Sequence, residues 1–182
     1  MNQEYTISIF SENSIGLLNR ITIIFTRRKL NIESLTVSES AIKGVFKFTI
    51  VVNCEEQMAK HLVKQIEKQI DVIRAFYLTP DEILHQEIAM YKIETSSLLE
   101  TNLIEGLIRR YNARILEMTK EYTVIEKTGH KAETQELFEQ LKPYGVLQFV
   151  RSGRVAITRS KKELLSSYLD NLEKEHRHSV TV

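Results

Sequence analysis

Hydrophobic and polar positions in the first part of the chain follow first a strand period and then a helix period. Residues 5–9 alternate between large apolar and small hydroxyl side chains, which is typical of a half-buried strand. The turn residues 11–14 then offer helix N-cap chemistry. The next apolar residues fall on one helical face: Leu17, Leu18, Ile21, Ile24 and Phe25. The basic run 27–29 suits the end of that helix, where its dipole is negative.

The pattern continues with a hairpin, a second helix and a last strand. A strand through Leu35 and Val37 precedes a short turn at Gly44, and residues 45–52 alternate again, so we expect these two strands to pair. Apolar residues at three-and-four spacing predict a helix over residues 59–70, and residues 72–77 are typical of a strand. The resulting order is βαββαβ, as in ferredoxin-like folds.

The same order recurs in the second half without obvious residue identity. We expect strands at residues 88–93, 115–118, 122–125 and 146–150, with helices through residues 104–111 and 137–141. The sequence therefore predicts an α/β protein, an α+β sandwich of two ferredoxin-like domains. We place them at residues 1–80 and 81–159, because Pro80 interrupts both helix and sheet pairing. We expect residues 160–182 to form a helical or disordered tail, whose apolar stripe must cover either this domain or another subunit.

Composition and charge exclude several classes of protein. The 182 residues carry 25 Lys and Arg against 24 Asp and Glu, so a net charge of +1 attracts neither nucleic acid nor an anionic membrane. The apolar runs are too short to span a bilayer, and the N-terminus lacks the features of a signal peptide. The lone Cys54 cannot form an intramolecular disulfide. We therefore expect a cytoplasmic protein.

The segments around Asn13 and Asn31 contain the residue types that bind a free amino acid. A helix N-terminus near Ser14 offers N–H groups and partial positive charge to a carboxylate. The two asparagine amides can both donate and accept, and Gly16 permits close approach of a ligand. Apolar neighbours could wall a small pocket, namely Ile15, Leu17 and Ile32. The plainer alternative is that Asn13 only caps a helix and Asn31 only starts a strand.

Signatures of catalysis, metal binding and RNA binding are missing from the sequence. The five histidines are scattered without metal-ligand spacing, and no nucleophile or nucleotide-binding motif occurs. RNA-binding domains of the same βαββαβ order stack bases on aromatic residues of the third strand. Here those positions hold Val45 and Lys47, whereas Phe46 and Phe48 point to the other face, into the core. The basic turn at residues 151–154 could grip an anion, but a simple connection between strands explains it better.

Several segments resemble the small regulatory subunit of acetolactate synthase, also called acetohydroxyacid synthase. Residues 13–21, Phe25, residues 31–37 and the Asp71-Val72 pair look like the N-terminal ACT domain of that family. Residues 87–93, 126–129 and 151–156 resemble its C-terminal domain. The resemblance spans about residues 4 to 159, and its most specific part is Asn31-Ile32-Glu33-Ser34-Leu35.

The resemblance implies a noncatalytic subunit that activates a large catalytic subunit and confers feedback inhibition by valine or another branched-chain amino acid. It implies a homodimer with the effector between two ACT domains. Thiamine diphosphate, magnesium and FAD would then belong to the catalytic partner, with no cofactor or metal in this chain. The residues carried over to the effector site are Asn13, Ser14, Ile15, Gly16, Leu17, Asn31 and Ile32.

Three features depart from the family pattern, and two other functions stay open. Lys29 stands where the family usually has glycine, Ile15 where a small residue or proline is frequent, and the tail from Ser160 extends the usual end. The first alternative is a free-standing ACT-type amino-acid sensor that controls a different partner. The second is a small enzyme that uses a cleft between the domains, which would need a cluster of titratable residues.

Overall fold

The chain folds into two compact units, which are described separately. The computed structural model describes residues 2–100, 102–161 and 163–179. The first unit, called the N-terminal unit, combines residues 1–84 with residues 156–182. The second, called the inserted unit, comprises residues 85–155. The segment that the sequence set apart as a tail thus groups with the beginning of the chain.

The N-terminal unit is built on a four-stranded antiparallel sheet of order β2-β3-β1-β4. Its strands are β1 (Gln3–Glu12), β2 (Ser34–Glu39), β3 (Val45–Cys54) and β4 (Val72–Leu78). β1 pairs with both β3 and β4, so it lies inside the sheet, whereas β2 has β3 as its one neighbour. The expected hairpin of β2 and β3 is confirmed by their register.

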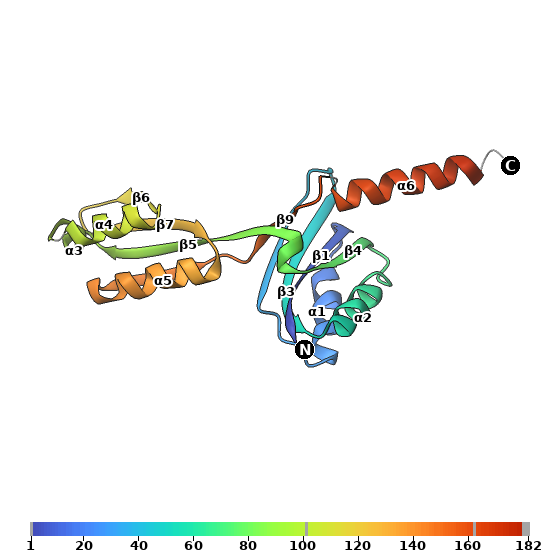
Figure 1. The fold of residues 1–182 in the computed structure, drawn as a ribbon, viewed down its shortest axis with the longest axis horizontal. Coiled ribbons are helices and arrows are strands. Elements are labelled where there is room, and N and C mark those ends of the chain that lie inside the picture. The colour runs from blue at the N-terminus through green and yellow to red at the C-terminus, as the bar shows by residue number, and fades with distance from the viewer. Residues whose placement is uncertain (1, 101, 162, 180–182) are drawn as a thin grey trace. The chain divides into compact units, whose positions relative to one another are not determined.

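Two helices, α1 (Leu17–Arg27) and α2 (Glu56–Ile66), accompany this sheet, and both are seen beside it in Figure 1. The core joins their apolar stripes to alternate residues of β1 and β3, as the periodicity predicts. Phe48 is buried in this core and Phe46 packs against it. The third strand therefore carries its aromatic side chains inward, as the sequence indicated.

The C-terminal end of α1 explains the unusual Lys29. The N–H of Leu30 donates to the carbonyl of Phe25 at 3.1 Å, and the N–H of Lys29 to that of Thr26 at 3.0 Å. These two bonds form a Schellman motif, in which the residue after the cap adopts the left-handed conformation. Lys29 has a φ of 55° accordingly. A glycine at this position would adopt this conformation without strain.

The inserted unit repeats the order, with strands arranged β6-β7-β5-β8. Its strands are β5 (Ile83–Glu94), which begins at the boundary, β6 (Arg114–Met118), β7 (Tyr122–Gly129) and β8 (Val146–Arg151). The short strand β9 (Val155–Thr158), which pairs with β5, belongs mostly to the N-terminal unit. The helices are α3 (Thr95–Glu100), α4 (Asn102–Arg110) and α5 (Lys131–Leu141). A core centred on Tyr91 packs residues of α4 and α5 against the sheet. Two βαββαβ folds are thereby confirmed.

Some boundaries in this region differ from the expected ones. β5 begins at Ile83, five residues before the expected start, and the short helix α3 was not expected. One short 3-10 helix, Pro80–Glu82, directly precedes β5, and another, Lys142–Tyr144, directly follows α5. The start of β5 was not predicted because His85, Gln86 and Glu87 are polar and do not follow the hydrophobic alternation of a strand.

The C-terminal segment packs on the N-terminal unit before it continues as α6 (Leu164–Ser179). Leu165 is fully buried, and Ala156 and Leu164 join Leu78 and Ile83 in a small apolar cluster. The guanidinium carbon of Arg74 lies 4.9 Å from the ring centre of Tyr168. The expected tail helix is present, and within the described residues no helix has the length and hydropathy that crossing a membrane requires.

We expect the variant Lys29→Gly to stabilise the N-terminal unit. Glycine removes the strain of a left-handed lysine but adds chain entropy in the unfolded state, for a net gain of about 0.5–1 kcal/mol. Thermal unfolding followed by circular dichroism would then show a midpoint higher by about 2 °C.

A matched control is Lys68→Gly, because Lys68 is also an exposed lysine after a helix but is not among the residues with positive φ. Its replacement should leave the midpoint unchanged or lower it. If both variants shift the midpoint equally, the left-handed conformation of Lys29 has no energetic importance.

Candidate functional site

The first predicted site segment, residues 13–16, forms a tight loop between β1 and α1. The N–H of Ser14 donates to the carbonyl of Glu12 at 3.1 Å, and the N–H of Leu17 donates to the carbonyl of Ser14 at 3.2 Å. Asn13 is exposed to solvent at the end of β1. The loop is therefore fixed by its own backbone, and its asparagine side chain faces outward.

The N-terminus of α1 carries no side-chain cap. Gly16 occupies the N-cap position with a φ of 81°, and the first turn contains no acidic residue. A Cβ atom at Gly16 would meet nothing within 4 Å, so the space above the helix end is open. An uncapped helix end in open space leaves N–H groups and partial positive charge for an incoming anion.

An ion pair that the sequence analysis missed secures this loop. Arg20 donates to the carboxylate of Asp71 and lies 3.4 Å from the hydroxyl oxygen of Ser14. The backbone carbonyl of Asp71 also accepts from the N–H of Glu12 at 2.9 Å. The start of β4 is thereby tied to the end of β1 and to α1. The available signal was Asp71 in the motif directly before β4.

Two neighbouring hydrophobic residues of the loop have opposite environments. Ile15 is fully exposed, whereas Leu17, the first residue of α1, is 1% exposed and its side chain is part of the apolar core. Leu17 therefore presents its backbone to the loop, and its side chain is not on the loop surface with Ile15. A large apolar side chain that stands wholly in water is a surface available for contact with another molecule.

The second predicted segment, Asn31 and Ile32, lies at the other end of α1. The side chain of Asn31 is exposed and its amide donates to the carboxylate of Glu33 at 3.0 Å, while Ile32 packs against the core. The eleven residues of α1 separate the two segments by about 16 Å at 1.5 Å per residue. Within a single chain the two predicted segments therefore lie at opposite ends of α1.

Titratable residues elsewhere do not assemble a metal centre among the described residues. His85 and His130, expected to be scattered, come together with 3.1 Å between Nε2 and Nδ1. Within the described chain, however, no group of three or more His, Cys, Asp or Glu side chains could hold a metal. Cys54 is buried, and burial raises the pKa of its thiol, which disfavours the reactive thiolate.

The basic turn after β8 has a structural role. Arg151 pairs with Glu87 at 2.8 Å and donates to the side-chain oxygen of Gln135 at 2.9 Å. The hydroxyl of Ser152 accepts from the N–H of Ile88 at 2.9 Å. These bonds hold the end of β8 against β5 and α5, so the turn serves as a connection.

Comparison with known proteins assigns both halves to one family. A family model described as "AHAS small subunit-like ACT domain" matches residues 7–74. A second, described as "Small subunit of acetolactate synthase", matches residues 86–160.

Whole-length relatives give the same assignment. The acetolactate synthase small subunit of Bacillus subtilis is 36% identical over 156 residues, which cover 85% of this chain and 90% of the relative. That of Mycobacterium leprae is 32% identical and covers 87% of this chain and 93% of the relative. The crystal structure of the Thermotoga maritima small subunit superposes with a TM-score of 0.79 at 25% identity, covering 88% of this chain and 99% of that one. The chain therefore belongs to the family of acetolactate synthase small subunits, which are regulatory and contain an ACT domain.

Proposed function

We propose that this protein activates the large catalytic subunit of acetolactate synthase in the cytoplasm and makes it sensitive to valine or another branched-chain amino acid. Membership of the small-subunit family supports a large catalytic partner. Thiamine diphosphate, magnesium and FAD would be held by that partner. The observation that carries the effector part of the proposal is the uncapped, open N-terminus of α1.

The effector carboxylate would lie at the N-terminus of α1, above Gly16. The N–H groups of the first turn can donate to it, and the helix dipole favours its negative charge. Asn13, at the edge of the same loop, supplies an amide that can reach either the carboxylate or the ammonium group. Ile15 supplies an apolar surface for a branched side chain, since it is fully exposed in one chain.

The remaining predicted residues would come from a second copy of the chain. Asn31 and Ile32 lie at the far end of α1, too distant to touch an effector bound at Gly16 of the same chain. A homodimer with two-fold symmetry can place the end of one α1 beside the start of the other. Each dimer would then hold two equivalent effector sites, each made from both subunits.

The edge strand β2 is suited to form this dimer. It lies at the edge of the sheet beside β3, and Val37 on it is 41% exposed. Leu18 of α1 is 44% exposed as well. If two β2 strands pair antiparallel, the two α1 helices also run antiparallel, because a two-fold axis relates them. That arrangement brings the loop at Gly16 toward Asn31 of the other copy.

An effector that joins two subunits regulates by differential affinity. It favours whichever arrangement of the dimer it fits better, and it shifts the population toward that arrangement. The catalytic partner would be inhibited if its active state requires the other arrangement. The alternative of a free-standing sensor would bind the same amino acid without altering acetolactate synthase.

The direct test is reconstitution with an acetolactate synthase catalytic subunit. We expect this chain to raise the rate of acetolactate formation, and valine, leucine or isoleucine to reverse the increase. Serine serves as the polar control and should have no effect. A chain that binds valine but never changes the catalytic rate would refute the regulatory role and favour the free-standing sensor.

Charge at position 16 should decide effector binding. Gly16→Asp places a carboxylate where the effector carboxylate binds, whereas Gly16→Asn has the same shape without the charge. Both side chains tolerate the left-handed φ and have open space. Repulsion between like charges should weaken valine binding about tenfold or more in the aspartate variant relative to the asparagine variant.

Calorimetric titration of the two full-length variants measures this difference. Aspartate is also a good N-cap residue, so a stable fold is expected for both variants. Equal affinities in the two variants would remove the helix N-terminus as the carboxylate site.

The two-subunit site predicts rescue between defective chains. Asn13→Ala and Asn31→Ala each damage both sites of their own homodimer. In a mixed dimer, one site carries both substitutions and the other carries neither. Coexpression of the two variants should therefore restore about a quarter of the normal valine sites when subunits pair at random. Calorimetric stoichiometry of the mixture, compared with each variant alone, reports the rescue.

A site confined to one chain would give no rescue at all. Asn53→Ala is a suitable control because Asn53 is an exposed asparagine on β3. It should bind valine like the unmodified chain.

A further inference from the structure

The face of the N-terminal sheet that points away from α1 and α2 is buried although it is largely polar. Alternate residues of β1 and β3 on this face are at most 4% exposed, namely Thr6, Ser8, Phe10 and Thr49. The C-terminal segment lies against part of this face, since Ser8, Phe10 and Lys47 share a cavity with residues of that segment and Lys47 donates to the carbonyl of Ala156. Small hydroxyl side chains under a cover leave room that large apolar ones would fill.

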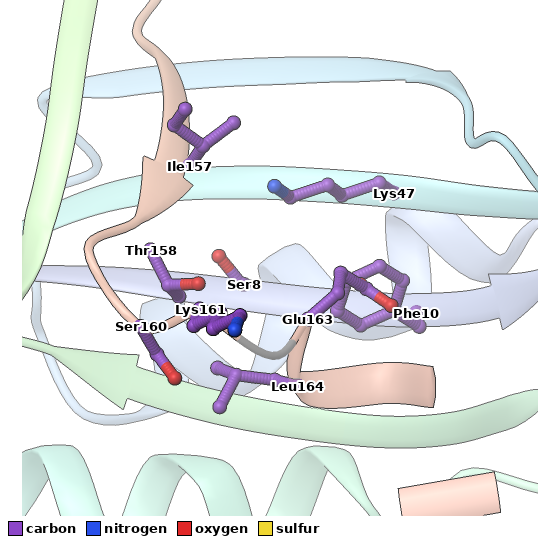
Figure 2. Close-up of a pocket in the computed structure, with 9 residues that line it drawn as sticks. All are labelled: Ser8, Phe10, Lys47, Ile157, Thr158, Ser160, Lys161, Glu163 and Leu164. Atoms are coloured by element: carbon purple, nitrogen blue, oxygen red, sulfur yellow. The ribbon is translucent and has the colours of Figure 1, made fainter. Parts of the chain in front are cut away.

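A cavity of about 210 Å³ remains between this face and a part of the C-terminal segment that contributes residues 157, 158, 160, 161, 163 and 164. Figure 2 shows Ser8, Phe10 and Lys47 on the sheet strands and Thr158 and Lys161 on the segment that crosses them. At about 30 Å³ for each water in the liquid, the cavity has the volume of about seven waters. It could hold a molecule with a comparable number of non-hydrogen atoms.

The cavity has an excess of positive charge. Its charged lining residues are Lys47, Lys161 and Glu163. Burial lowers the pKa of Lys47, and the nearby carboxylate of Glu163 opposes this effect only in part. The ammonium group of Lys47 donates to the carbonyl of Ala156 at 2.8 Å. This hydrogen bond satisfies one N–H of the ammonium group, but the carbonyl carries no opposite charge. A bound anion would supply the missing charge.

The one acidic residue of the lining has another task. An oxygen of Glu163 accepts from the N–H of Ser166 at 2.9 Å and from its hydroxyl at 2.7 Å. This carboxylate therefore caps the start of α6. The cavity lining thus carries two ammonium groups and one carboxylate, and one oxygen of that carboxylate is engaged in the helix cap. The net positive charge of the lining favours an anion over a cation.

We propose that this cavity binds a small aliphatic monocarboxylate, at a site separate from the amino-acid site at α1. Lys47 and Lys161 hold the carboxylate. The hydroxyls of Ser8 and Thr158 are placed for an oxo or hydroxyl oxygen beside it, and Phe10 contributes apolar surface to the short carbon chain. The C-terminal segment supplies part of the lining, so this segment has a binding role in addition to packing.

The test is a titration of the full-length protein with 2-methylpropanoate and with 2-oxobutanoate, followed by calorimetry. Isobutylamine, which has a similar shape and the opposite charge, is the control ligand. Saturable binding of the carboxylates without binding of the amine is expected. Absence of carboxylate binding would overturn the proposal.

Matched lysine variants locate the site. Lys47→Met keeps the alkyl stem and removes the charge, and it should weaken carboxylate binding at least tenfold. Lys43→Met makes the same change at an exposed position in the β2–β3 turn and should leave binding unchanged. Lys161→Met supplies a second loss-of-charge variant that leaves the sheet intact, and it should also weaken binding. Equal affinity in Lys47→Met, Lys43→Met and the unmodified chain would overturn the assignment.

One further variant separates this site from the proposed amino-acid site. Gly16→Asp changes the N-terminus of α1 and should not affect carboxylate binding in the cavity. If Gly16→Asp abolishes carboxylate binding while Lys47→Met preserves it, the probe binds at α1 and the cavity assignment is refuted.

Discussion

The burial of β1 on both faces is the constraint on which the N-terminal unit depends. One face of this strand carries the apolar core under α1 and α2, and the other carries Ser8 and Phe10 under the C-terminal segment. Its pairing with β3 and β4 fixes the register of the strand, and thereby the position of its C-terminal end relative to its two neighbours. The strand therefore determines where three features lie: the loop at Asn13, the N-terminus of α1 and the floor of the cavity.

Local patterns predicted the elements well because most helices and strands here have one apolar face. The second face of β1 could not be predicted in the same way. Its serine and threonine residues read as solvent-exposed, but they are covered by a segment about 150 residues later in the chain. Sequence periodicity reports the local environment of a strand and contains no signal for a distant cover. The short helix α3 was also not predicted, because its first residues, Thr95, Ser96 and Ser97, favour turns over helices.

The candidate site shows a different limit of sequence reasoning. The motif residues around Asn13 and Asn31 were located, and the left-handed φ of Lys29 accounts for the glycine that the family prefers there. Their spatial relation was not predictable, because it depends on the length of α1 and on the symmetry of an assembly. The ion pair of Arg20 with Asp71 was also missed, since its partners are 51 residues apart and neither has an unusual local pattern.

The inserted unit interrupts the N-terminal unit in the covalent order of the chain, and this affects how the protein is made. Residues 1–84 leave the ribosome first, but the segment that covers their sheet follows only after residue 155. Until that segment has been made, the outer face around Phe10 lacks the residues that share its cavity in the complete fold. The covalent order of the chain therefore delays the contact between this sheet and its cover until the inserted unit has been synthesised.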